Sequence, residues 1–142
     1  MSKGNTFEND LVALIFNATA IGNIADNAAS SPLTALYVSL HTGDPGEGGS
    51  QTTSECAYGS YARVSVNRNA GGWTVTGNSV SPTANIDFPQ ASSGTETATF
   101  AAVGTASSGA GKILYSGAVS PSIAISTGVT PRLTTASTIT ED

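Results

Sequence analysis

The only histidine, His41, stands three residues before Asp44, and this pair is the sequence's candidate for general-base chemistry. An imidazole oriented by a carboxylate accepts a proton readily. The nucleophile would have to come from an unrelated serine, because the chain has no Gly-x-Ser-x-Gly turn. A histidine at the end of a strand, hydrogen-bonded to the following loop, explains the same pattern. We therefore predict no catalytic residue and no enzyme, with a small hydrolase as the weakest alternative.

Three acidic residues, Asp44, Glu47 and Glu55, border a glycine-rich segment and raise the question of a hard cation. A calcium-binding loop needs oxygen ligands at alternate positions and a glutamate at the twelfth, which residues 44–49 do not provide. The same segment lacks the Gly-Lys-Ser/Thr ending of a phosphate-binding loop. We predict a turn built by the Pro-Gly pair, with no metal and no cofactor. A cation that bridges two subunits at this loop is the alternative.

Cys56 and Trp73 are each the only residue of their type. The carboxylate of Glu55 next to Cys56 raises rather than lowers a thiol pKa, so we expect a packed, unreactive thiol. One cysteine excludes an intrachain disulfide and a multi-cysteine metal site. Trp73 and the other aromatic residues are candidates for a sugar-binding site, but packing in the core is the default expectation because large rings bury much area.

The composition excludes several classes of function. Charged residues make up 11% of the 142 residues, with a net charge of −5, against roughly 25% in ordinary domains. Five basic residues do not supply the phosphate contacts that nucleic-acid binding needs. No apolar run reaches the roughly 18–20 residues of a membrane span, and no secretory signal is recognisable at the start. Burying a surface rich in Ser, Thr, Ala and Gly costs little side-chain entropy and little desolvation of charge. We therefore expect the protein to act within an assembly.

The beginning of the chain has helical periodicity. We predict a helix over residues 6–18, with Asn5 as N-cap and Glu8 reaching back to it. Its apolar residues recur at i, i+4, i+7 and i+8 and so share one face: Phe7, Leu11, Leu14 and Ile15. Residues 20–31 form either a second short helix or a loop, which Pro32 ends.

The rest of the chain alternates between apolar and polar residues, as strands with one buried face do. The predicted strands cover residues 36–40, 61–67, 73–76, 84–88, 97–103, 112–119, 123–125 and 132–140. Short strands with turn residues between them, and no strand–helix–strand unit, favour a mainly β fold. We predict an antiparallel β-sandwich or jelly-roll-like fold of seven to eight short strands with a short N-terminal α-helix. Residues 1–31 form the helix and arm and residues 32–142 the sandwich, as a single domain overall.

Several segments in a fixed order carry a resemblance to a known family. They are Leu36–Glu47 (LYVSLHTGDPGE), Gln51-Thr52, Glu55, Gly59–Val64 (GSYARV), Trp73, Ile86–Pro89 (IDFP) and Ile113–Val119 (ILYSGAV). On these segments the chain resembles a family of small virion proteins of tailed bacteriophages, over almost its whole length. It departs from the family pattern at Ser60, where a glycine often stands, and in residues 20–31.

The resemblance implies a structural role in the virion, after assembly in the host cytoplasm. Family members carry tail-fibre or minor structural labels, which do not fix a position on the particle. We favour a capsid decoration (cement) protein that binds the major capsid protein and copies of itself as a dimer or trimer, with no nucleic-acid or membrane partner. The alternatives are a tail-tip or fibre-base subunit and a carbohydrate-binding adsorption module.

The segments best able to reach a neighbour are the exposed, irregular ones: the N-terminal arm and the loop of residues 42–50. Arginines are candidates for pairing with acidic residues of an adjoining subunit, and solvated arginines on the outer face of a sheet are the alternative. The predicted interface residues are Phe7, Leu11, Thr42, Asp44, Glu47, Arg63, Arg68 and Arg132.

Overall fold

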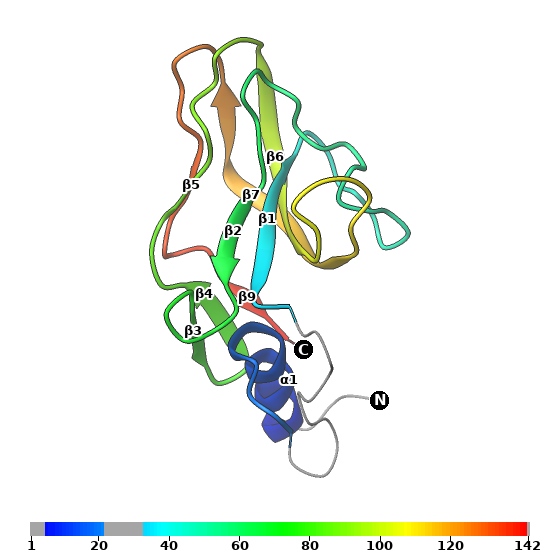
Figure 1. Cartoon of the computed structure of the whole chain (residues 1–142), viewed down its shortest axis with the longest axis vertical. Helices are drawn as coiled ribbons and strands as arrows, with labels where there is room; N and C mark the ends of the chain where they lie inside the picture. Colours follow the sequence, from blue (N-terminus) through cyan, green and yellow to red (C-terminus); the bar gives the residue numbers. More distant parts are fainter. Residues whose placement is uncertain (1–4, 22–32, 142) are drawn as a thin grey trace. The chain divides into compact units, whose positions relative to one another are not determined.

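The computed structural model describes residues 5–21 and 33–141 (Figure 1). They form one helix, α1 (Asn5–Asn17), and nine strands: β1 (Ala35–His41), β2 (Val64–Asn67), β3 (Trp73–Thr76), β4 (Ser79–Pro82), β5 (Ile86–Asp87), β6 (Glu96–Gly104), β7 (Ile113–Ile125), β8 (Arg132–Leu133) and β9 (Ile139–Thr140). The strands form sheets with the orders β2-β1-β6-β7, β3-β4-β9 and β5-β8. The predicted mainly β fold with antiparallel sheets and a short N-terminal helix is confirmed.

Two compact units divide the chain, and each is assembled from segments that are distant in the sequence. Unit 1 comprises Met1–Ala35, Val66–Ile86 and Leu133–Asp142, and unit 2 comprises Leu36–Ser65 and Asp87–Arg132. Helix α1 thus belongs to the same unit as β3, β4 and β9. The predicted boundary at residues 31 and 32 lies outside the described residues, and that division into domains stays a prediction.

In unit 1, α1 packs against β3 and β4. Val12 and Phe16 are fully buried, and the ring of Phe16 meets that of Trp73 edge-on, with centroids 4.6 Å apart. The predicted buried face of the helix was wrong, because the face that is fully buried is centred on Val12 and Phe16. The described members of that predicted face are only half-buried: Leu11, Leu14 and Ile15. The side chain of Phe7 and residues 22–32 lie outside the described part.

The sheet of unit 1 is built on the antiparallel hairpin of β3 and β4. The hairpin turns at Gly77, whose φ of +62° suits a glycine. The predicted last strand over residues 132–140 is instead two short strands, β8 and β9, in different sheets. Between them the Ser137 N–H donates to the Thr134 carbonyl and turns the chain. The predicted strand at residues 84–88 is likewise reduced to the two residues of β5.

In unit 2, β1, β6 and β7 form an antiparallel sheet. Leu36, Val38 and Leu40 of β1 are buried, as their alternation predicts. The predicted separation of the strands over residues 112–119 and 123–125 was wrong, because β7 continues through Pro121 as one strand of 13 residues. Strand β7 lies at the edge of its sheet, where a missing N–H is tolerated, and its register against β6 shifts near this point, between Ala98 and Phe100.

Candidate functional site

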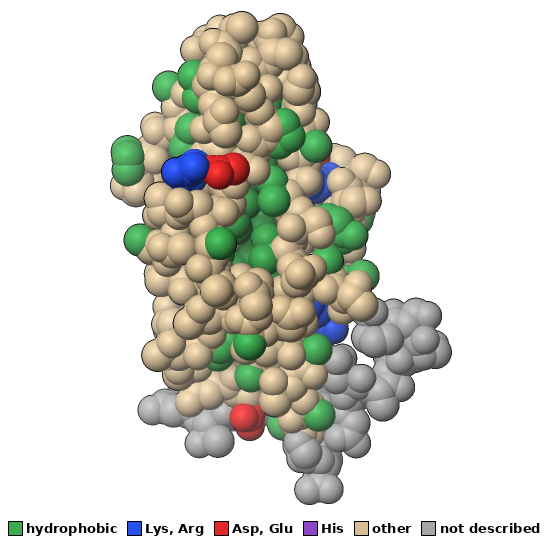
Figure 2. All heavy atoms as spheres, turned by 60° about the vertical axis from the view of Figure 1, so that its left-hand side comes forward, with side chains coloured by type: hydrophobic (Ala, Val, Ile, Leu, Met, Phe, Trp, Pro, Cys, Tyr) green, Lys and Arg blue, Asp and Glu red, His purple; other side chains and the backbone are tan. Residues whose placement is uncertain are grey.

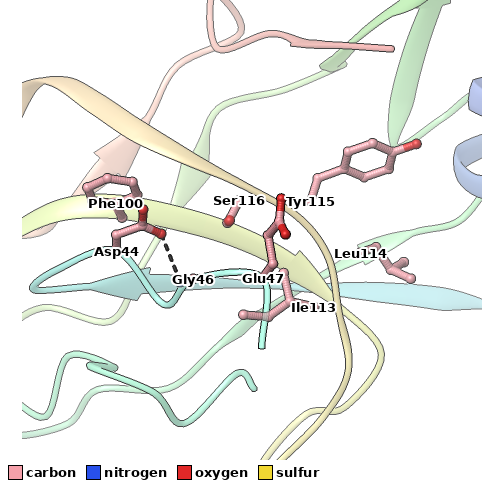
Figure 3. Close-up of a pocket in the computed structure, with 8 residues that line it drawn as sticks. All are labelled: Asp44, Gly46, Glu47, Phe100, Ile113, Leu114, Tyr115 and Ser116. Atoms are coloured by element: carbon pink, nitrogen blue, oxygen red, sulfur yellow. Dashed lines mark hydrogen bonds between the residues drawn. The ribbon is translucent and has the colours of Figure 1, made fainter. Parts of the chain in front are cut away.

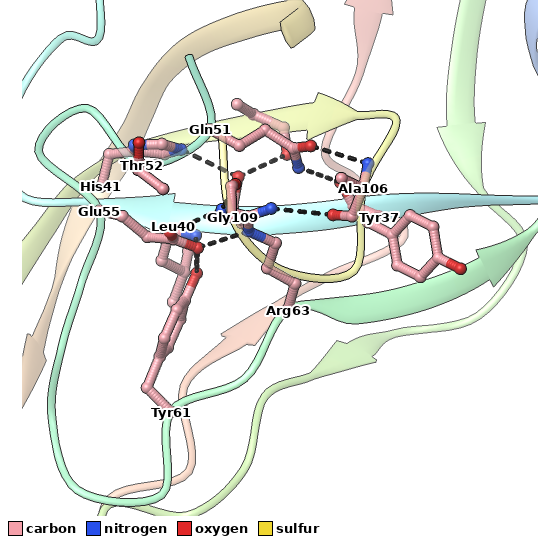
Figure 4. A network of polar contacts seen from close by, with 12 residues as sticks. Tyr37, Leu40, His41, Gln51, Thr52, Glu55, Tyr61, Arg63, Ala106 and Gly109 are labelled. Atoms are coloured by element: carbon pink, nitrogen blue, oxygen red, sulfur yellow. Dashed lines mark hydrogen bonds and ion pairs between the residues drawn. The ribbon is translucent and has the colours of Figure 1, made fainter. Parts of the chain in front are cut away.

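The long segment between β1 and β2 carries most of the motif residues, and a buried ion pair lies at its centre (Figure 4). Arg63 binds Glu55 with two parallel hydrogen bonds, Nε to Oε1 at 2.7 Å and Nη2 to Oε2 at 2.8 Å. The Tyr61 hydroxyl donates to Glu55 Oε1 at 3.0 Å and accepts from the Leu40 N–H at 3.1 Å. The side chain of Arg63 is 2% exposed and that of Glu55 16%, so the pair is an internal connection of the fold.

Arg63 also connects this segment to the loop between β6 and β7. Its Nη1 donates to the Ala106 carbonyl at 2.9 Å and its Nη2 to the Gly109 carbonyl at 2.7 Å. The hydrogen bonds to Glu55 raise the pKa of Arg63 above its ordinary value. Arg63 was expected to meet acidic residues of an adjoining subunit, but its partners lie in its own chain, because the loop carbonyls and Glu55 surround the guanidinium.

Gln51 makes a second connection between the same two loops. Its Nε2 donates to the Tyr37 carbonyl at 3.3 Å, and its Oε1 accepts from the Ala106 N–H at 3.0 Å. The amide lies against Gly104 and Gly111, where an added Cβ would come within 2.2 Å of Gln51 atoms. Two glycines are therefore needed where this side chain passes, and neither was singled out in the sequence because the residues that meet here are distant along the chain.

His41 is fully buried, and both of its ring nitrogens are engaged. The Thr53 carbonyl lies 2.8 Å from Nδ1 and can only accept, so Nδ1–H donates to it, and Nε2 lies 2.9 Å from the Ser39 hydroxyl. Asp44 is bound elsewhere, since its Oδ1 accepts the Gly46 N–H at 2.9 Å and forms the predicted turn. The predicted hydrogen bond between His41 and the following loop is confirmed.

Cys56 is buried beside two carboxylates. Burial first, and then the charges of Glu96 and Glu55, raise the pKa of its thiol to about 12, as the sequence predicted for a packed thiol. Glu96 itself is structural, because its Oε1 accepts the N–H groups of Ala57 and Tyr58 at 2.9 and 2.8 Å. Glu96 lies about forty residues from these partners in the sequence, so no local pattern marked it.

Ser60, at which the resemblance expected a glycine more often, has a backbone conformation that favours glycine. Its φ is 74°, in the left-handed region that favours glycine. Its hydroxyl donates to Ser92 Oγ at 2.8 Å, which holds the turn in a conformation that a serine does not prefer. The backbone therefore requires a positive φ here whichever residue occupies the position.

A shallow groove of about 410 Å³ is the candidate binding site of unit 2 (Figure 3). It is lined by the loop after β1, by β6 and by the start of β7, through Asp44, Gly46, Glu47, Phe100, Ile113, Leu114, Tyr115 and Ser116. Two of the predicted acidic residues meet here, whereas Glu55 is bound to Arg63. Among the described residues, no three His, Cys, Asp or Glu side chains are grouped so that they could hold a metal ion. The groove therefore offers two carboxylates beside aromatic and aliphatic side chains.

Arg68 holds the end of α1. Its Nη2 donates to the Leu14 carbonyl at 2.6 Å and its Nε to the Ile15 carbonyl at 2.5 Å, which the last helical turn leaves without helical partners. A third bond reaches the Leu33 carbonyl at 3.3 Å, and burial lowers the pKa of Arg68. A cation at this end also complements the helix dipole. These partners of Arg68 all lie within unit 1, and a contact of Arg68 with another subunit stays a prediction.

Four of the remaining predicted interface residues are exposed: Thr42, Asp44, Glu47 and Arg132. Arg132 pairs with Asp87 of its own chain, Nε to Oδ1 at 2.5 Å, with side chains 52% and 46% exposed. This hydrogen-bonded pair raises the pKa of Arg132 and lowers that of Asp87. Thr42 is exposed and bonds Ser54 O through its hydroxyl at 3.2 Å. A role at an interface stays a prediction for all of these residues: Phe7, Leu11, Thr42, Asp44, Glu47 and Arg132.

Trp73 lies in the core of unit 1 and is 2% exposed. The expectation that this ring packs in the core is confirmed. Its indole N–H is buried and has no hydrogen-bond partner among the residues that the structure describes. The ring therefore offers no face to a sugar, and the sugar-binding alternative loses its first candidate. In the described part of the chain, no helix is both long and apolar enough to cross a membrane.

The comparisons with known proteins identify the family. A model of the Gp80 family, described as "Podophage GP4 fiber I protein gp80", matches residues 4–140. No protein of curated function matches the chain. The class is that of bacteriophage virion structural proteins. The chain belongs to the Gp80 family, since the match covers nearly all of it.

Proposed function

We propose that this chain is a structural subunit of the fibre apparatus of a podophage virion. The family match over residues 4–140 carries this proposal, because the family's description names a fibre protein of a podophage. The sequence favoured a capsid decoration protein, with a tail-associated subunit as the alternative. The family description moves the preference to the tail-associated alternative.

The geometry of unit 2 supports a mechanical rather than a chemical role. Histidine and cysteine are the residue types that most often do chemistry, and both His41 and Cys56 are buried. His41 is hydrogen-bonded to the loop, and Cys56 lies beside two carboxylates. The motif residues Gln51, Glu55 and Arg63 fix one loop on another. A segment of more than twenty residues without regular structure is thus held rigid, which suits a subunit that must keep its shape under load.

The surface also suits permanent contacts with other proteins. On the face shown in Figure 2, charged side chains are few, and hydrophobic groups are scattered among small polar side chains and backbone. Covering such a surface costs little in desolvation of charge. Many weak contacts of this kind add up when a symmetric assembly repeats them.

Copy number and position on the particle test the proposal. In purified virions, quantitative mass spectrometry against the major capsid protein is expected to give on the order of a few dozen copies or fewer, as symmetric tail appendages have. Cryo-EM of particles carrying a tagged chain should place the added density on the tail. Hundreds of copies, with density on the head, would contradict the fibre assignment.

A capsid decoration protein is the second candidate, and the charge-poor surface favours it equally. Under that alternative the protein binds the major capsid protein across many equivalent sites. Particles assembled without it would then burst at a lower temperature than complete ones. Under the fibre proposal the same particles keep their head stability and lose adsorption to the host, so one deletion separates the two candidates.

A further inference from the structure

The groove of unit 2 combines two kinds of surface (Figure 3). Strands β6 and β7 contribute apolar side chains that are half-buried: Phe100, Ile113 and Leu114. The loop after β1 contributes the carboxylates of Asp44 and Glu47, and both residues are exposed. A ligand that fills the groove therefore needs both an apolar part and a positive charge.

The two carboxylates are not neutralised by the part of the chain that the structure describes. Asp44 accepts one hydrogen bond, from the Gly46 N–H, and within the described residues neither Asp44 nor Glu47 forms an ion pair. Lys112, which precedes Ile113, forms no ion pair with a described residue either. The arginines are bound by acceptors of their own chain: Arg63, Arg68 and Arg132. The groove therefore presents unpaired negative charge.

The turn that carries the carboxylates is held in place by the protein itself. The Gly49 N–H donates to the Gly46 carbonyl at 3.1 Å, and an added Cβ at Gly49 would collide with the carbonyl oxygen of the buried Pro45. The Thr99 hydroxyl of β6 donates to the Thr42 carbonyl at 2.9 Å and connects the loop to this strand. A site that is ordered in advance loses less entropy when a ligand binds.

An arginine side chain has the chemistry that this groove requires. Its guanidinium binds carboxylates through a planar fork of donors and stacks on aromatic rings such as that of Phe100, while its aliphatic stem covers apolar surface. The groove of about 410 Å³ is near the lower end of the roughly 300–1,000 Å³ of ligand pockets, so it suits single side chains rather than a whole helix. Since the arginines of this chain are bound within it, a second copy does not supply the side chain.

We propose that the groove binds an arginine side chain, with an apolar residue beside it, that projects from a different protein of the virion. The net charge of −5 favours the approach of a basic partner. The inference goes beyond the fibre assignment and does not depend on whether the protein sits on the tail or on the head. Each of the two can therefore fail while the other stands.

A short peptide tests the groove directly. The full chain, isotope-labelled for amide NMR, is titrated with the peptide acetyl-Gly-Leu-Arg-Leu-Gly-amide. Saturable shifts are expected at the amides of Gly46, Glu47, Phe100 and Ser116, with a dissociation constant of about 1 mM because exposed charge pairs contribute little. The same peptide with citrulline, which has nearly the shape of arginine without its charge, should bind at least about fivefold more weakly.

Two double variants separate the groove from the overall charge. Asp44→Asn with Glu47→Gln removes both charges and keeps an Oδ1 that accepts the Gly46 N–H, so the turn should persist while the arginine peptide binds at least about fivefold more weakly. Asp10→Asn with Asp87→Asn gives the same net charge and leaves the groove carboxylates in place. This control should bind the peptide like the wild type, and circular dichroism of each variant checks folding.

Several results would overturn the inference. The groove amides show no saturable shift up to about 10 mM arginine peptide, or the citrulline or lysine peptide binds as tightly as the arginine peptide. Equal binding by the two double variants would likewise remove the role of Asp44 and Glu47. Shifts of the groove amides with protein concentration alone would assign the groove to a second copy. Saturation of these amides by calcium chloride or glucosamine at lower concentration than the peptide would assign it to a cation or a sugar.

Discussion

Each of the two units is stabilised internally by a different kind of contact. In unit 1, a helix that satisfies its own backbone packs Phe16 edge-on against Trp73. In unit 2, the segment between β1 and β2 makes mostly short turn hydrogen bonds of its own. Polar side chains connect it to the rest of the unit: Gln51 and Arg63 bind the backbone of the loop between β6 and β7, and Glu96 binds the N–H groups of Ala57 and Tyr58. Backbone groups inside a protein must find partners, so the buried parts of an irregular segment need polar side chains beside them.

The largest effect is expected from breaking the ion pair of unit 2. Arg63→Ala leaves Glu55 and the Ala106 and Gly109 carbonyls without their donor, and removing one member of a buried pair costs about 3–5 kcal/mol. Chemical denaturation followed by tyrosine near-UV circular dichroism measures it, since all four tyrosines lie in unit 2: Tyr37, Tyr58, Tyr61 and Tyr115.

The matched control for Arg63→Ala is Arg132→Ala, which breaks the half-exposed pair with Asp87. Exposed pairs contribute little, so the transition should not move measurably. If the two arginine variants lost the same stability, the Arg63 network would be no more than a surface contact.

A similar loss is expected in unit 1 from an apolar deletion. Phe16→Ala removes a fully buried ring against Trp73, and such changes cost about 3–5 kcal/mol. Trp73 is the only tryptophan and lies in unit 1, so its fluorescence follows this unit. A Phe16→Leu variant, which keeps most of the apolar volume, should recover part of the loss, and a flat response in both would show that the helix does not stabilise unit 1.

A smaller loss of stability is expected where the Gln51 side chain packs against Gly104 and Gly111. Gly104→Ala places a Cβ within 2.2 Å of the Gln51 amide, and crowding of this kind costs about 1–3 kcal/mol. Gly117→Ala, whose Cβ meets nothing, is the neutral control on the neighbouring strand. Thermal unfolding compares the two. Equal melting temperatures would mean that Gln51 moves aside without loss, and the role given to its hydrogen bonds would be wrong.

A pH dependence confined to unit 2 is expected above pH 9. Burial raises the pKa of Cys56 from 9.0 to about 12 and that of Tyr58 from 10.0 to about 12. The unfolded chain loses these protons first, so this contribution is fully present below pH 9 and is lost as the pH rises toward 12. Stability measured by tyrosine circular dichroism should fall across this window. Cys56→Ala should flatten part of the slope, and an unchanged slope would refute the role given to burial of the thiol.

The contrast between the units also sets what the sequence predicts. The helix is recognisable from Asn5, Glu8 and its periodicity because neighbours three and four residues apart decide it. The same periodicity misplaced the buried face, since Val12 and Phe16 point inward for reasons that lie in β3 and β4. Local patterns therefore give the element and leave its orientation to tertiary packing.

The polar network was beyond local patterns altogether. Gln51 meets Ala106, and Arg63 meets Ala106 and Gly109, across more than forty residues of chain. A lone arginine in a sequence looks like a surface charge, and nothing near Arg63 indicates that loop carbonyls will enclose it. The resemblance included Gln51, Glu55 and Arg63 in separate segments, and only the fold shows that they connect the same two loops.

Cys56 gives the protein a built-in probe. The thiol is 3% exposed and its pKa is about 12, so at neutral pH an alkylating reagent finds neither a surface nor a thiolate to attack. Alkylation of Cys56 therefore requires the surrounding segment to separate from Glu96. The chain has no other cysteine. The rate at which Cys56 is labelled in intact particles therefore reports how often the segment around it opens, whether by heat or on contact with a host cell.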